Sequence, residues 1–121
     1  METKTTLVIG ASEKQERYSY LAVNRLIKQG HQVVAIGARE GKIGNVKIET
    51  GFPDFKNIDT ITLYLSKKNQ SLFYNYILAL KPRRLIFNPG AENEELFALA
   101  TKNNIEAVEA CTLVMLSTGE F

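Results

Sequence analysis

The sequence has little of the residues on which several protein classes depend. It contains no tryptophan, one cysteine, Cys111, and one histidine, His31, in 121 residues. A single cysteine cannot form an internal disulfide, and one cysteine with one histidine is too small a set for a structural zinc site. The sequence therefore argues against a disulfide-stabilised scaffold, and we predict no metal centre.

Long apolar segments and an excess of one charge are also missing. No run approaches the roughly 18 apolar residues of a membrane span, and the first residues, with Glu2 and Lys4, lack the apolar segment of a signal peptide. The 15 Lys and Arg residues against 13 Asp and Glu residues give a net charge of +2, and the basic residues are scattered. We therefore expect a cytoplasmic protein that binds neither membranes nor nucleic acid.

What remains is the composition of one globular domain. Hydrophobic residues make up 45% of the chain and charged residues 23%, and we find no linker, internal repeat or low-complexity segment. A chain of 121 residues is large enough for one core and too small for two domains. We therefore expect residues 1–121 to form a single domain.

Short apolar runs alternate with helical patterns along the chain. Buried strands are predicted at residues 5–10, 32–37, 60–65 and 84–88, and an edge strand at 105–110. Apolar residues at helical spacing predict amphipathic helices that contain residues 22–27, 72–80 and 96–100, and a last helix begins near Cys111. This alternation predicts an α/β fold: a doubly wound, Rossmann-like, mainly parallel five-stranded sheet with helices on both faces.

Residues 38–59 break this alternation. They contain Gly41, Gly44, Gly51 and Pro53, and they leave room for one short strand at 46–49. A loop of this length inside a compact domain is usually functional or poorly ordered.

The turn Gly10-Ala11-Ser12 follows the first predicted strand. Ligands of such sheets bind outside the carboxyl ends of the strands, near the point where the strand order reverses. A glycine there allows close backbone approach, the Ser12 hydroxyl can donate to a phosphate oxygen, and the next helix supplies unpaired N–H groups. Strand-to-helix turns also carry Gly and Ser for conformational reasons alone, so this turn by itself leaves both interpretations open.

The other strand ends bring cations and flexible backbone to the same edge. Arg39 and Lys42 follow the second strand, Ser66 and Lys67 follow the third, and Asn88-Pro89-Gly90 follows the fourth. Such a set suits a ligand with more than one phosphate.

Two features separate this edge from a typical NAD site. The G-x-G-x-x-G fingerprint is absent, because the next glycine after Gly10 is Gly30. The second strand is also followed by Arg39 and lacks, at its end, the acidic residue that would hold the ribose of NAD. Both features favour a ligand with an extra phosphate on its ribose, such as coenzyme A (CoA) or NADP.

Five segments together resemble the small stand-alone CoA-binding proteins of bacteria, and the resemblance covers essentially all of the chain. They are VIGAS at 8–12, the stretch 33–55, TLYLSKKNQ at 62–70, IFNPGAENEEL at 86–96 and EACTLVMLSTGEF at 109–121. A similar Rossmann-type module forms the CoA-binding domain of the succinyl-CoA synthetase alpha subunit. The chain has neither the acid-substrate site nor the phosphorylated histidine domain of that enzyme, so the resemblance implies CoA binding without ligase activity.

The resemblance also implies roles for particular residues. Gly10, Ala11 and Ser12 would hold the phosphates, and the loop from Arg39 to Gly44, with Lys42, would meet the nucleotide end. The remaining residues would flank the adenosine or pantetheine and close the far side of the site: Leu65, Ser66 and Lys67, and Asn88, Pro89 and Gly90.

Other candidates carry a structural alternative. Tyr18 could stack on adenine, and Arg17 either pairs with a phosphate or is a solvated residue at the start of a helix. Ser19 suits the N-cap of that helix, a role compatible with ligand contact. Cys111 lies at the ligand edge, where a helix dipole can lower a thiol pKa, but a lone cysteine is more often a packing residue.

Two further groups are interpreted as structural. His31 precedes the second strand and so lies at the edge opposite the ligand. Glu92, Glu94 and Glu95 match the first turn of a helix, where negative charge is favourable.

The sequence thus predicts a non-catalytic module that binds CoA or an acyl-CoA, with no catalytic residue and no metal. The alternatives are a small NADP- or CoA-dependent enzyme and a regulatory subunit of a separate CoA-utilising enzyme. The sequence leaves open a protein partner or a homo-oligomer, the acyl group, the pathway, and whether Cys111 reacts with the CoA thiol.

Overall fold

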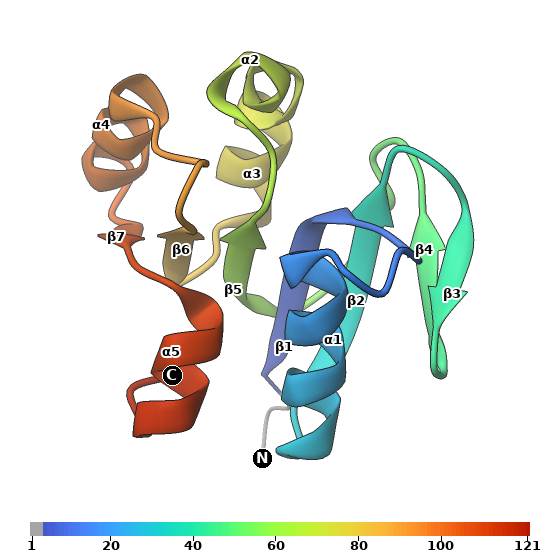
Figure 1. Ribbon diagram of the computed structural model, residues 1–121. Coiled ribbons are helices and arrows are strands. Elements are labelled where there is room, and N and C mark those ends of the chain that lie inside the picture. The colour runs from blue at the N-terminus through green and yellow to red at the C-terminus, as the bar shows by residue number, and fades with distance from the viewer. Residues whose placement is uncertain (1–3) are drawn as a thin grey trace.

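Seven strands form one sheet through the middle of the computed structural model, which describes residues 4–121 (Figure 1). The order of the strands is β3-β4-β2-β1-β5-β6-β7, and every neighbouring pair except β3–β4 is parallel. The strands are β1 (Thr5–Ala11), β2 (Gln32–Gly37), β3 (Gly41–Ile43), β4 (Val46–Glu49), β5 (Ile58–Leu63), β6 (Arg84–Phe87) and β7 (Glu106–Glu109). The strand order reverses beside β1, as in other doubly wound folds.

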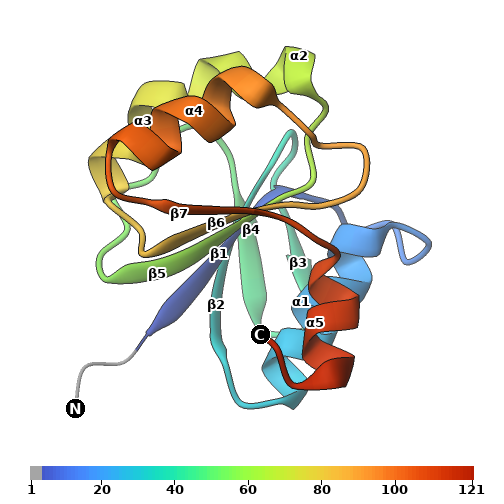
Figure 2. The same ribbon diagram turned by 90° about the vertical axis from the view of Figure 1, so that its left-hand side faces the viewer.

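Helices cover both faces of this sheet (Figure 2). One face carries α1 and α5, and the other carries α3 and α4. The helices are α1 (Tyr18–Lys28), α2 (Lys67–Gln70), the 3-10 turn η1 (Ser71–Phe73), α3 (Tyr74–Leu80), α4 (Glu94–Lys102) and α5 (Thr112–Thr118). None of the helices within residues 4–121 is long and apolar enough to span a membrane.

Alternation along the central strand divides the core between the two faces. In β1, Leu7 and Ile9 pack into the cluster beneath α3 and α4, whereas Val8 packs into the cluster beneath α1 with Val23 and Leu26. These side chains are fully buried. A central strand with both faces covered has to be continuously apolar, which is why its sequence predicts it clearly.

The predicted α/β, mainly parallel, Rossmann-like architecture is confirmed, but the predicted number of five strands is wrong. Residues 38–59 contain two strands, the predicted one at 46–49 and the unpredicted β3, and these pair antiparallel as a hairpin at the sheet edge. β3 is only three residues long, so it shows no periodicity of its own. The hairpin forms because β4 pairs with β2 and because Ile43 and Ile48 are buried under α1.

The segment after the hairpin also packs against the domain. The Phe52 ring lies edge-to-face on Phe73, with ring centroids 5.3 Å apart, and the Tyr76 hydroxyl donates to the carbonyl of Pro53. Through these contacts, the segment between β4 and β5 packs against η1 and α3.

A carboxylate at the start of β5 joins that strand to the start of β6. Arg83 donates to Asp59 through Nε at 3.0 Å and Nη2 at 3.2 Å, and the Thr60 hydroxyl donates at 2.8 Å. Burial alone would raise the pKa of the Asp59 carboxyl, but these hydrogen bonds and the charge of Arg83 outweigh burial and lower that pKa below its usual 3.8.

This lowered pKa predicts an acid-dependent loss of stability. A carboxyl whose pKa is lower in the folded state stabilises the fold above its unfolded pKa, and this contribution disappears as the pH falls through the folded pKa. Asp59→Asn should therefore reduce the urea midpoint at neutral pH, and its difference from the wild type should shrink below about pH 4. Asp54→Asn is the control, because Asp54 is exposed and its ion-pair partner within residues 4–121 is the exposed Lys56. A difference for Asp59→Asn that stays constant down to about pH 2 would contradict the prediction.

Candidate functional site

A cleft of about 780 Å³ lies along the carboxyl edge of the central strands. Its walls come from the β1–α1 connection, the residues after β2, the β5–α2 connection and the residues after β6. The lining residues are Gly10, Ala11, Ser12, Glu13, Lys14, Arg17, Tyr18, Ser19, Ala38, Arg39, Glu40, Tyr64, Leu65, Ser66, Asn69, Pro89, Gly90 and Ala91. This edge is at the top of Figure 1, where β2 and β5 end. Its volume lies in the range of about 300–1,000 Å³ that small-molecule sites occupy.

The glycine of the first turn is required by the packing of the strands. Gly10 has φ of +97°, and a Cβ built there would lie 2.9 Å from the carbonyl carbon of Tyr64. The backbone approaches closely because the Tyr64 N–H donates to the Ile9 carbonyl at 2.8 Å. Gly10 thus permits contact between two strands, and its presence alone does not indicate a ligand.

Ser12 and the residues after it provide the polar groups of the turn. The Lys14 N–H donates to Ser12 Oγ at 3.1 Å, so the hydroxyl proton of Ser12 remains available to donate. Ser12 is half-buried, and the Lys14 and Arg17 side chains are exposed beside it in the cleft lining. Together with Arg39 after β2, these two side chains place three cations along the cleft.

Most of the predicted site residues are brought together here. Those that line the cleft are Gly10, Ala11, Ser12, Tyr18, Ser19, Arg39, Leu65, Ser66, Pro89 and Gly90. The predicted N-cap role of Ser19 is wrong: α1 begins at Tyr18, its N-cap residue is Arg17, and Ser19 is buried within the first turn.

Three predicted residues do not line the cleft. Lys42 is exposed on β3, and Lys67 is exposed at the start of α2. Asn88 is 2% exposed and lies beneath the cleft. Its amide donates to Thr62 Oγ1 at 2.6 Å and to the Leu63 carbonyl at 2.8 Å, and its Oδ1 accepts from the Thr112 N–H at 2.8 Å. Asn88 therefore connects β5, β6 and α5.

Five lining residues that can ionise or hydrogen-bond were not predicted as site residues: Glu13, Lys14, Glu40, Tyr64 and Asn69. Glu40 directly follows Arg39, so a carboxylate does lie close to the end of β2, one residue beyond the position at which we noted Arg39 and no acidic residue. Lys14 and Glu13 are in the β1–α1 connection, and their position after a strand end was the available signal. Nothing local in the sequence marks Tyr64, because it continues an apolar strand.

The Tyr64 phenol is neutral at physiological pH. Burial raises its pKa to about 12. Its Oη is buried beside the hydroxyls of Thr62 and Thr112, which lower this pKa less than burial raises it. Tyr64 therefore contributes a flat neutral wall to the cleft.

The remaining sequence candidates lie outside the cleft. Cys111 is the half-buried N-cap residue of α5, and His31 contacts Phe121 edge-to-face at 5.1 Å on the far side of the sheet. Glu92 accepts from the Gly90 N–H at 2.9 Å, while Glu94 and Glu95 occupy the first turn of α4. The predicted first-turn position is confirmed for Glu94 and Glu95 and is wrong for Glu92, which precedes the N-cap residue Asn93. No group of three potential metal ligands occurs within residues 4–121.

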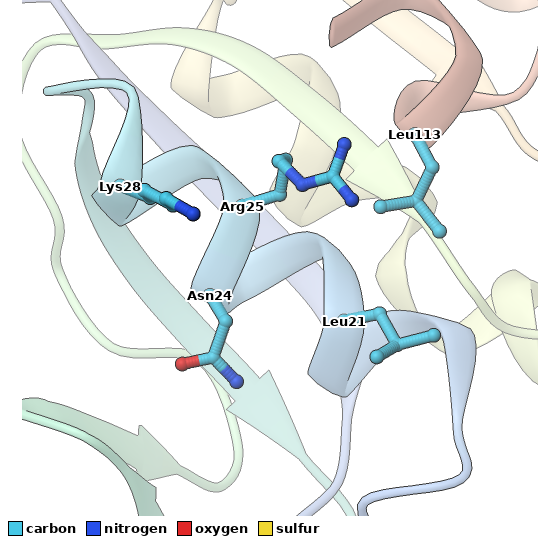
Figure 3. Close-up of a pocket in the computed structure, with 5 residues that line it drawn as sticks. All are labelled: Leu21, Asn24, Arg25, Lys28 and Leu113. Atoms are coloured by element: carbon cyan, nitrogen blue, oxygen red, sulfur yellow. The ribbon is translucent and has the colours of Figure 1, made fainter. Parts of the chain in front are cut away.

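A second, smaller hollow lies between α1 and α5 (Figure 3). It measures about 260 Å³ and is lined by Leu21, Asn24, Arg25, Lys28 and Leu113. The Arg25 side chain extends from α1 toward Leu113 on α5. None of the predicted site residues lies in it.

A comparison with protein families finds one whose model covers nearly all of the chain. Residues 4–117 match the model of the family described as "CoA binding domain". The chain belongs to that family. No curated protein matches the sequence.

Solved structures share the fold of this CoA binding domain. One, titled only as an uncharacterized protein, is 47% identical, covers 100% of both chains and has a TM-score of 0.95. A hypothetical protein from Pyrococcus horikoshii OT3 is 16% identical over 93% of this chain and 81% of its own, with a TM-score of 0.85. A Thermus thermophilus structure, cell-free ID.343, is 19% identical over 98% and 91%, also with a TM-score of 0.85. The last two likenesses concern the fold alone.

Proposed function

We propose that this chain binds CoA or an acyl-CoA in the cleft and has no catalytic activity of its own. The observation that carries the proposal is the gathering of Ser12 and Arg39, with the other predicted lining residues, along one cleft in a chain that belongs to a CoA-binding family. CoA carries a pyrophosphate and a 3′-phosphate, and Lys14, Arg17 and Arg39 provide cations for them.

The lining groups support binding without catalysis. Neither His31 nor Cys111 lines the cleft, and the Tyr64 phenol keeps its proton at neutral pH. General acid–base catalysis needs a group that titrates near the working pH. The carboxylates in the lining, Glu13 and Glu40, come from the turn after β1 and the turn after β2, and we assign them to binding.

Isothermal titration calorimetry with CoA, dephospho-CoA, NADP and NAD tests the proposal. CoA should bind most tightly. Dephospho-CoA should bind at least about tenfold more weakly, because a hydrogen bond to a charged group contributes roughly 1.5–3 kcal/mol. Absence of CoA binding, or NAD binding as tight as that of CoA, would overturn it.

A further inference from the structure

Glu13 joins the first turn to the edge hairpin. Its Oε2 accepts a hydrogen bond from the Lys42 N–H at 3.0 Å, across 29 residues of sequence. The contact fixes a carboxylate that also lines the cleft. It is the only side-chain hydrogen bond between the turn after β1 and strand β3 within residues 4–121.

The carboxylate of Glu13 lies directly against the backbone of Gly41. A Cβ built on Gly41 would be 2.4 Å from Glu13 Cδ and 2.6 Å from Oε1. Gly41 does not have a positive φ, so backbone conformation does not explain the glycine. Its lack of a side chain leaves space for the Glu13 carboxylate, which is held against β3 by the hydrogen bond from the Lys42 N–H.

The second oxygen of Glu13 has no partner. No donor within residues 4–121 bonds to Oε1, although the residue lines the cleft. A fixed carboxylate oxygen in a nucleotide cleft is suited to accept a hydrogen bond from a sugar hydroxyl. In dinucleotide-binding folds an acidic residue after the second strand takes this role. In this chain the carboxylate of Glu13, from the turn after β1, lies against Gly41, which is four residues after the end of β2. It therefore lies near the place that the acidic residue occupies in those folds.

We propose that Glu13 is the ribose-binding carboxylate of this site, with Oε1 accepting a hydrogen bond from the free 2′-hydroxyl of CoA. The inference rests on the proposed function. Arg39, which lines the same cleft, is the matching cation for the 3′-phosphate. Glu40 also lines the cleft, and both carboxylates are exposed, but only Glu13 accepts a hydrogen bond from the described chain, so ordering Glu40 would cost more entropy.

A pair of ligand fragments tests this assignment. Adenosine 3′,5′-bisphosphate carries the 2′-hydroxyl, and 2′-deoxyadenosine 3′,5′-bisphosphate lacks it. Wild-type protein should bind the first about tenfold more tightly, as expected for a charge-assisted hydrogen bond. In Glu13→Ala the ratio of the two dissociation constants should fall to about one, and in Glu13→Gln, which can still accept from Lys42 N–H, to below about three.

Matched variants separate ribose binding from a structural role. Glu16→Gln removes an exposed carboxylate of the same turn that does not line the cleft, and it should leave the ratio at about ten. A purely structural Glu13 would weaken both fragments equally and keep the ratio, which would overturn the assignment. A ratio of the two dissociation constants near one in the wild type would also overturn the assignment. The same holds if Glu40→Gln abolishes the preference for the 2′-hydroxyl and Glu13→Gln keeps it.

The result also distinguishes this inference from the proposed function. If CoA binds but neither bisphosphate does, the ribose end is not held and the role of Glu13 is refuted alone. If CoA and both fragments fail to bind, the proposed function fails and the ribose assignment fails with it.

Discussion

Arg39→Glu is expected to weaken CoA binding by at least about tenfold, because the change removes one phosphate-binding cation and adds a repulsive carboxylate. Arg39 is exposed in the cleft lining after β2 and forms no ion pair within residues 4–121. The free energy of unfolding should therefore change by no more than about 0.5 kcal/mol. Calorimetry at fixed ionic strength measures the binding, and urea denaturation measures the stability.

Lys47→Glu is the matched control for this variant. Lys47 is exposed on β4 and does not line the cleft, so its substitution makes the same change in net charge away from the site. If both variants weakened CoA binding equally, the effect would come from net charge, and the role of Arg39 would be refuted. An unchanged CoA affinity in Arg39→Glu would refute it as well.

Asn88→Ala is expected to destabilise the fold by roughly 3 kcal/mol, because it removes three buried hydrogen bonds. The Leu63 carbonyl and the Thr112 N–H each lose the bond to Asn88, and Thr62 Oγ1 keeps its bond to the Thr112 hydroxyl at 2.7 Å. Asn88→Asp should also destabilise, because a carboxylate cannot donate to the Leu63 carbonyl. Urea denaturation with a common slope for all variants gives the free energies.

Asn75→Ala provides the comparison for Asn88. Asn75 is exposed on α3, so its substitution should change the free energy of unfolding by no more than about 0.5 kcal/mol. A loss below about 1 kcal/mol in Asn88→Ala would show that the buried network contributes little. A variant that folds with wild-type stability and no longer binds CoA would restore the ligand role that the sequence suggested.

Asn88 shows that the position of a residue at a strand end does not predict whether its side chain is buried. The sequence places this residue correctly at the carboxyl edge of β6, but it does not say whether the side chain points into the cleft or beneath it. The partners that decide the question lie 24 to 26 residues away, on β5 and α5. Lys42 and Lys67 are also near this edge and do not line the cleft, because a position near an edge does not fix the direction of a long side chain.

Gly10 and Gly41 are explained by contacts within the fold. Gly10 is at the turn where the sequence placed it, but the close approach that it permits is to the backbone of Tyr64. A bulky residue at Gly10 would disturb the β1–β5 contact, so substitution there cannot separate binding from folding. Gly41 is explained only by the side chain of Glu13, which is 28 residues away in the sequence.

The pattern of the sequence was enough to predict the fold class, the edge of the sheet where the cleft lies and ten of the residues that line this cleft. It could do so because central strands buried on both faces, and helices with one apolar stripe, leave a periodic pattern in the chain. Three features are visible only in the three-dimensional structure: the edge hairpin, the burial of Asn88 and the contact of Glu13 with Gly41. These features depend on contacts between distant segments, and such contacts leave no periodic pattern in the sequence.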